Sequence, residues 1–148
     1  MTNTTSPIQI RRLLWVGPLT VLAAVVGVLI VRAIAMVVLP PPYAPGLGMV
    51  MVPIVLTVVL CTAAVVVFAL VGRFAKNPIR TYIIISSVFL VISFLPDLSV
   101  PSMRTAMPGA TWGYAITLMI MHVVAGFITV SMLIKLTAAK SKIETNQI

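Results

Sequence analysis

Charge is scarce in this chain of 148 residues, because only 8% of them are Asp, Glu, Lys or Arg. A typical globular chain has about 25% charged and about 45–50% apolar residues, whereas 61% of this chain is hydrophobic. A soluble protein with so little charge could not cover its surface with polar groups. The composition therefore predicts that lipid surrounds most of the protein.

Acids, cysteine and histidine are also rare. The two acids are Asp97 and Glu144, the one cysteine is Cys61 and the one histidine is His122. A single cysteine excludes an internal disulfide, a CxxC redox pair and a cysteine zinc site. A single histidine inside a hydrophobic run, with no acid at its expected depth, makes a poor catalytic triad. We therefore expect no enzyme activity, no catalytic residue, no metal site and no cofactor.

The ten Lys and Arg residues give a formal net charge of +8. In a soluble protein such an excess would suggest nucleic-acid binding. Here the basic residues lie between apolar runs and are not interleaved with aromatic residues, so they are better explained as topology signals and contacts with anionic lipids. The expected partners are the lipid bilayer, including its anionic lipids, and no nucleic acid.

Four apolar stretches, at about 13–39, 49–72, 79–95 and 112–136, are candidate membrane spans. A bilayer core of about 30 Å needs around 20 apolar residues per helix, so the third stretch must stand upright or borrow flanking residues. Period-two alternation is absent, which excludes barrel strands. Proline ends the first stretch at Pro40 and the third at Pro96. The prediction is an all-α, four-helix transmembrane bundle, up-down-up-down, in one domain covering 1–148.

The distribution of basic residues predicts the orientation of these spans. Eight of them fall on one side of a four-span topology: Arg11, Arg12, Arg73, Lys76, Arg80, Lys135, Lys140 and Lys142. The other side has only Arg104 and Asp97. By the positive-inside rule, we expect a multi-pass protein of the cytoplasmic membrane with both termini in the cytoplasm.

Ionisable groups inside a span are costly, so each is a candidate functional residue. Arg32 lies about 10 Å before the predicted end of the first span, at ~1.5 Å per residue. It either snorkels to the outer headgroups, pairs with Asp97, which is the only acid on that side, or binds a ligand. The sequence therefore leaves the ion pair Arg32–Asp97 as one hypothesis.

Further polar residues share one face of the third span. Tyr82, Ser86, Ser93 and Asp97 have helical spacing, which favours interhelical hydrogen bonds or a polar path for protons or a small solute. His122 lies near the middle of the fourth span. It is either a hydrogen-bonded buried side chain, a cofactor ligand or a proton relay.

Two short motifs carry a family resemblance. The third span ends in SFLPDL (93–98), and the fourth contains MHVVA (121–125). This half of the chain resembles a bacterial four-helix membrane-protein family catalogued as domain of unknown function 6069. The resemblance implies a fold and a membrane location, but no activity.

The function expected from these residues is a structural, accessory or interaction protein, as a homo-oligomer or in a larger membrane complex. The alternative is a transporter or channel-like protein for protons or a small solute. A less favoured alternative is an electron-transfer or light-harvesting component that holds its cofactor through His122.

Overall fold

The computed structural model describes residues 10–39, 49–103, 105–106 and 109–138. The described elements are α1 (Ile10–Val38), α3 (Met51–Phe74), α4 (Pro78–Ser99), the 3-10 helix η1 (Val100–Met103) and α5 (Trp112–Ala138). Each of the four α-helices is long and apolar enough to cross a membrane. These findings confirm the predicted all-α, four-helix transmembrane fold. Arg104, Lys140, Lys142 and Glu144 lie outside the described residues, as do the prolines from Pro40 to Pro45.

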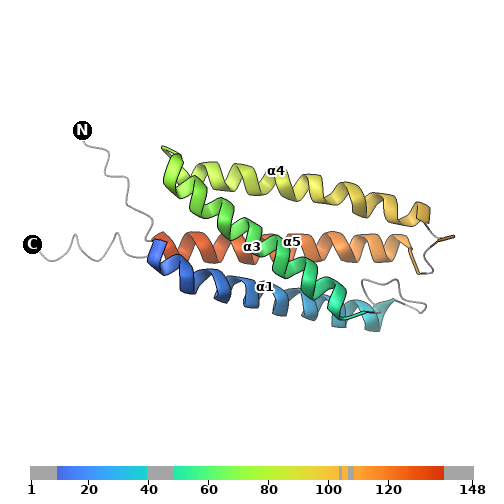
Figure 1. Cartoon of the computed structure of the whole chain (residues 1–148). Coiled ribbons are helices and arrows are strands. Elements are labelled where there is room, and N and C mark those ends of the chain that lie inside the picture. The colour runs from blue at the N-terminus through green and yellow to red at the C-terminus, as the bar shows by residue number, and fades with distance from the viewer. Residues whose placement is uncertain (1–9, 40–48, 104, 107–108, 139–148) are drawn as a thin grey trace, which may run out of the picture.

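The four helices run alternately up and down (Figure 1). Helix α5 packs against α1, α3 and α4, and α1 also packs against α3. Helix α3 crosses the bundle obliquely, from beside the end of α1 to the start of α4 (Figure 1). Helices α1 and α4 therefore lie across the bundle from each other, with α5 between them.

Helix α4 is longer than predicted and does not end at Leu95. It continues through Pro96 to Ser99, and η1 extends the apolar span to Met103. Pro96 removes one backbone hydrogen bond, to the carbonyl of Ile92, a loss that transmembrane helices tolerate. Two serine hydroxyl groups bond to other carbonyls of the same helix. The hydroxyl of Ser93 donates to the Leu90 carbonyl at 2.7 Å, and the hydroxyl of Ser99 donates to the Pro96 carbonyl at 2.7 Å. The third span is thus long enough to cross a bilayer.

The ends of α4 and α5 follow from local sequence. Pro78 begins α4, where a missing backbone donor costs nothing. Thr111 precedes α5, and its hydroxyl oxygen accepts a 3.3 Å hydrogen bond from the backbone N–H of Tyr114, as an N-cap residue does. Gly109 has a φ of 86°, a conformation that glycine adopts without strain.

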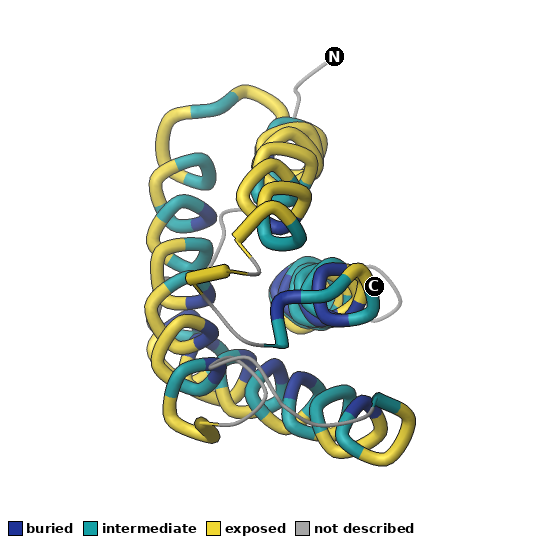
Figure 2. Tube along the Cα trace, turned by 90° about the vertical axis from the view of Figure 1, so that its right-hand side faces the viewer, coloured by how far each residue is buried: buried dark blue, intermediate teal, exposed yellow. Residues whose placement is uncertain are grey.

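Two buried clusters lie along the bundle axis. One cluster, toward the end of the bundle that holds Met103, joins α1 and α5; we call it the outer cluster. The other lies toward the end where α3 turns into α4, and we call it the inner cluster. It takes one residue from each long helix: Leu13, Phe68, Tyr82 and Leu133. Most of the remaining helix surface is exposed (Figure 2). That surface is rich in large apolar side chains such as Val37, which is 87% exposed, and Phe127, which is 73% exposed. An apolar exterior around a small core suits a protein in lipid.

Candidate functional site

The candidate site is a carboxyl–imidazole pair between α4 and α5. Oδ2 of Asp97 lies 2.9 Å from Nδ1 of His122. The Asp97 side chain is 6% exposed and the His122 side chain is 28% exposed. This is the only salt bridge found among the described residues. Both side chains lie within the apolar spans.

Two features of the fold bring these residues together. Helix α4 continues through Pro96, so Asp97 lies on a helical turn and follows Ser93 on the same face. Helix α5 then returns antiparallel beside α4, and a Cβ atom at Gly126 would lie only 3.7 Å from the Leu90 side chain. His122, one turn before Gly126, therefore faces Asp97. The pair lies about 15 Å along α5 from Trp112, at ~1.5 Å per residue.

The pair shares one hydrogen atom. Nδ1 of His122 donates it when the carboxyl group of Asp97 is ionised, and Oδ2 donates it when the carboxyl group is protonated. Either arrangement satisfies a group that would be costly to leave unpaired in lipid. The contact fixes the orientation of the imidazole ring, and it leaves Nε2 as the ring nitrogen that could take part in a second interaction. Chemically, the pair can hold α4 against α5, pass a proton or present Nε2 to a ligand.

The structure does not support the hypothesis that Arg32 pairs with Asp97. The carboxyl group of Asp97 is paired with His122, and no salt bridge of Arg32 is found in the part of the chain that the structure describes. The physical reason is the packing order, because α5 separates α1 from α4. Among the residues that the structure describes, Nε of Arg32 is buried without a hydrogen-bond partner.

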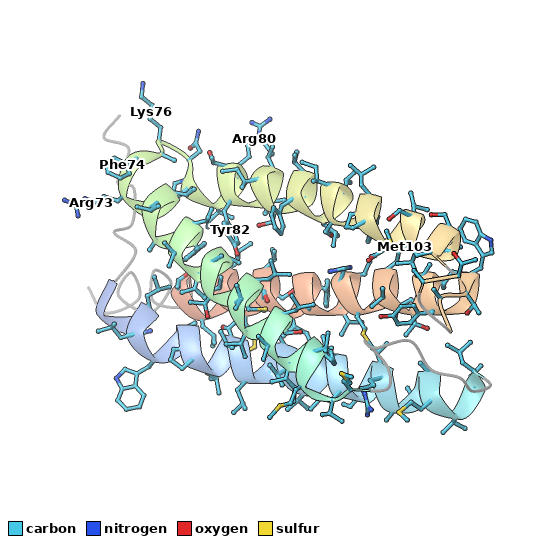
Figure 3. The ribbon with its side chains drawn as sticks, turned by 45° about the vertical axis from the view of Figure 1, so that its right-hand side comes forward. Arg73, Phe74, Lys76, Arg80, Tyr82 and Met103 are labelled. Atoms are coloured by element: carbon cyan, nitrogen blue, oxygen red, sulfur yellow. The ribbon has the colours of Figure 1, made fainter. Side chains whose placement is uncertain are left out.

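The predicted polar row of α4 is only partly buried. Tyr82 and Asp97 are buried, whereas Ser86 and Ser93 are of intermediate exposure. The Ser93 hydroxyl bonds to its own helix. Figure 3 shows the Tyr82 side chain pointing from α4 into the bundle, where its ring meets Phe68 edge-on with centroids 4.8 Å apart.

A second polar contact joins α3 to α5. Sγ of Cys61 lies 3.4 Å from Oγ1 of Thr129, and either atom can donate. Sequence reasoning noted Cys61 as the one cysteine but gave it no partner. It also missed the pairing of Asp97 with His122, although consecutive helices are usually neighbours.

Metal binding by a cluster of acids, histidines and cysteines has no candidate in the described ranges, where no group of three such side chains is found. A comparison with family models matches residues 5–139 to DUF6069, which is described as a family of unknown function. The match covers all four long helices and confirms the resemblance carried by segments 93–98 and 121–125. No curated protein and no solved structure matches the chain.

Proposed function

This chain belongs to DUF6069, a family of unknown function, and we propose that it is a structural or accessory protein of the cytoplasmic membrane. In this proposal it spans the membrane four times and acts by contact with other membrane proteins or with further copies of itself. It has no catalytic activity and no nucleic-acid partner.

The observation that carries the proposal is the use of polar side chains as links between helices. Asp97 and His122 join α4 to α5, and Cys61 and Thr129 join α3 to α5. Hydroxyl groups elsewhere, such as that of Thr117, bond to their own helix backbone. Interhelical hydrogen bonds of this kind stabilise membrane bundles, so these residues can act by fixing the shape of the bundle.

The exterior supports a role in assembly. Helix α4 has only two buried residues, Tyr82 and Asp97, and exposes a long apolar surface. The test is native mass spectrometry of protein extracted together with its bilayer in polymer-bounded discs. We expect a homo-oligomer or a complex of fixed stoichiometry. A single chain of 15.8 kDa, with bound lipid alone, would contradict the proposal.

The charge distribution supports an orientation with both termini in the cytoplasm. Arg73, Lys76 and Arg80 gather at the end where α3 turns into α4, opposite Met103 (Figure 3). Lys135 lies in the last turn of α5, at that same end. By the positive-inside rule this end faces the cytoplasm. A fluorescent protein that matures only in the cytoplasm should therefore fluoresce when fused after Ile148, and a dark fusion expressed at an equal level would contradict the orientation.

Transport of protons or a small solute is the second candidate, and the Asp97–His122 pair is the observation that favours it. Titratable pairs within a span occur in proton relays. Proton flux into liposomes distinguishes the two candidates. Transport requires that the wild type conduct and that Asp97→Asn, which keeps hydrogen-bonding capacity but cannot ionise, abolish the flux. Equal flux in wild type, Asp97→Asn and empty liposomes would exclude proton transport.

A further inference from the structure

Four buried polar side chains, one from each long helix, lie in the inner half of the bundle away from the Asp97–His122 pair. They are Thr20 of α1, Cys61 of α3, Tyr82 of α4 and Thr129 of α5, which are 0%, 4%, 1% and 3% exposed. We call them the inner polar layer. Nothing in the pairing of α4 with α5 accounts for them.

The helix contacts place these residues close together. Cys61 and Thr129 touch at 3.4 Å. A Cβ atom at Gly17 would lie 3.2 Å from Val65, so the next turn of α1, with Thr20, lies beside the turn of α3 that contains Cys61. Tyr82 belongs to the same inner cluster as Phe68 and Leu133, which lie seven residues beyond Cys61 and four beyond Thr129 on their helices. The phenol of Tyr82 reaches back far enough to interact electrostatically with the Cys61 thiol.

Two hydroxyl groups of the layer make no hydrogen bond of good geometry among the described residues: Oγ1 of Thr20 and the phenol oxygen of Tyr82. The Ser86 side chain, one turn along α4, lies near the phenol but leaves it without a well-formed bond. Threonine in a transmembrane helix can bond to the carbonyl four residues back, and Thr117 and Thr137 do so at 2.8 Å and 2.6 Å. Thr20 does not, although it is fully buried. An unpaired hydroxyl in apolar surroundings costs about 1–3 kcal/mol by mutational measurement.

We propose that the inner polar layer binds ordered water, with the hydroxyl groups of Thr20 and Tyr82 as its ligands beside the Cys61–Thr129 contact. The ligand must be small and able both to donate and to accept, because each hydroxyl does both. The layer has no charged residue that would favour an ion. Buried water molecules typically make about three hydrogen bonds to groups that would otherwise be unpaired. This inference does not depend on the proposed function.

The sign of a stability change tests the proposal. Thr20→Val and Tyr82→Phe each remove a hydroxyl group with little change of shape. If water is bound, each variant loses a hydrogen bond, and its unfolding equilibrium constant in lipid–detergent mixtures should rise about fivefold to tenfold, as expected for one net bond of about 1 kcal/mol. If the hydroxyls are dry, removing them relieves a penalty. An unchanged or smaller unfolding constant in both variants would overturn the proposal.

A direct measurement on the wild-type protein covers the case in which a variant fails to fold. Solid-state NMR in bilayers should show magnetisation transfer from water to Thr20 and Tyr82. Thr117 is the matched control, because its buried hydroxyl bonds to the Gly113 carbonyl. Transfer to Thr20 and Tyr82 well above that to Thr117 supports bound water, and transfer no greater than that to Thr117 contradicts it.

Discussion

Breaking the Asp97–His122 contact should destabilise the bundle, and the loss should depend on which of the two residues is replaced. Asp97→Ala leaves an imidazole that is 28% exposed, whereas His122→Ala leaves a carboxyl group whose side chain is 6% exposed. Removing the partner of a buried charge costs about 3–5 kcal/mol in soluble proteins, and leaving a less buried polar group unpaired costs about 1–3 kcal/mol. We therefore expect His122→Ala to be the more damaging substitution.

The interaction itself is worth less than either loss. Double-mutant cycles across hydrogen bonds in a membrane protein average about 0.6 kcal/mol, with a maximum of about 1.7 kcal/mol. A short contact that involves a carboxyl group belongs in the upper part of that range, because bonds to charged groups are stronger. The double variant should therefore be less destabilised than the sum of the single variants by about 1.5 kcal/mol.

The assay is reversible unfolding of the purified protein in mixed micelles, with four proteins in the cycle. Arg32→Ala combined with Asp97→Ala is the matched control, since these residues do not contact each other and their effects should add within about 0.5 kcal/mol. Additive losses for Asp97 and His122 would show that the pair does not form. Coupling between Arg32 and Asp97 instead would support the ion pair hypothesised from the sequence.

Three further predictions concern packing and access. Leu133→Ala, at a fully buried position, should lower the unfolding free energy by about 2 kcal/mol. This is near the lower end of the range for buried leucine, because the unfolded side chain in lipid is already in apolar surroundings. The control Leu136→Ala, at a 37% exposed position, should change the unfolding free energy by less than ~0.5 kcal/mol. Gly27→Ala should be less stable than Gly126→Ala by about 1 kcal/mol in the same assay. The new Cβ atom would lie 2.6 Å from the nearest side-chain atom at position 27, but 3.7 Å from the nearest one at position 126. Equal stabilities of the two variants would refute this packing. Cys61, which is buried, should resist maleimide in the folded protein and react on unfolding, and rapid labelling without denaturant would contradict its burial.

Hydropathy was sufficient to predict the four spans, because lipid requires long apolar helices whatever their packing. The end of the third span was predicted too early. Proline was treated as a helix terminator, whereas α4 continues through Pro96 to Ser99. Length rules thus give the number of spans more reliably than their boundaries.

Pairing of the polar groups could not be derived in the same way. Arg32 and Asp97 have opposite charges and lie on the same side of the predicted topology, but topology does not say which helices are neighbours. Helix α5 lies between α1 and α4, so Asp97 meets His122. Helical spacing did predict that Tyr82 and Asp97 share the buried face of α4, since that inference needs only the helix period.

Accessibility of single cysteines tests the four-span arrangement most directly. In a Cys61→Ser background, Lys76→Cys and Ser102→Cys place exposed thiols at opposite ends of the bundle. In intact cells a membrane-impermeant maleimide should label Ser102→Cys, and it should label Lys76→Cys only after the membrane is permeabilised. Labelling of both positions in intact cells, with the membrane sealed, would contradict a bundle that spans the bilayer.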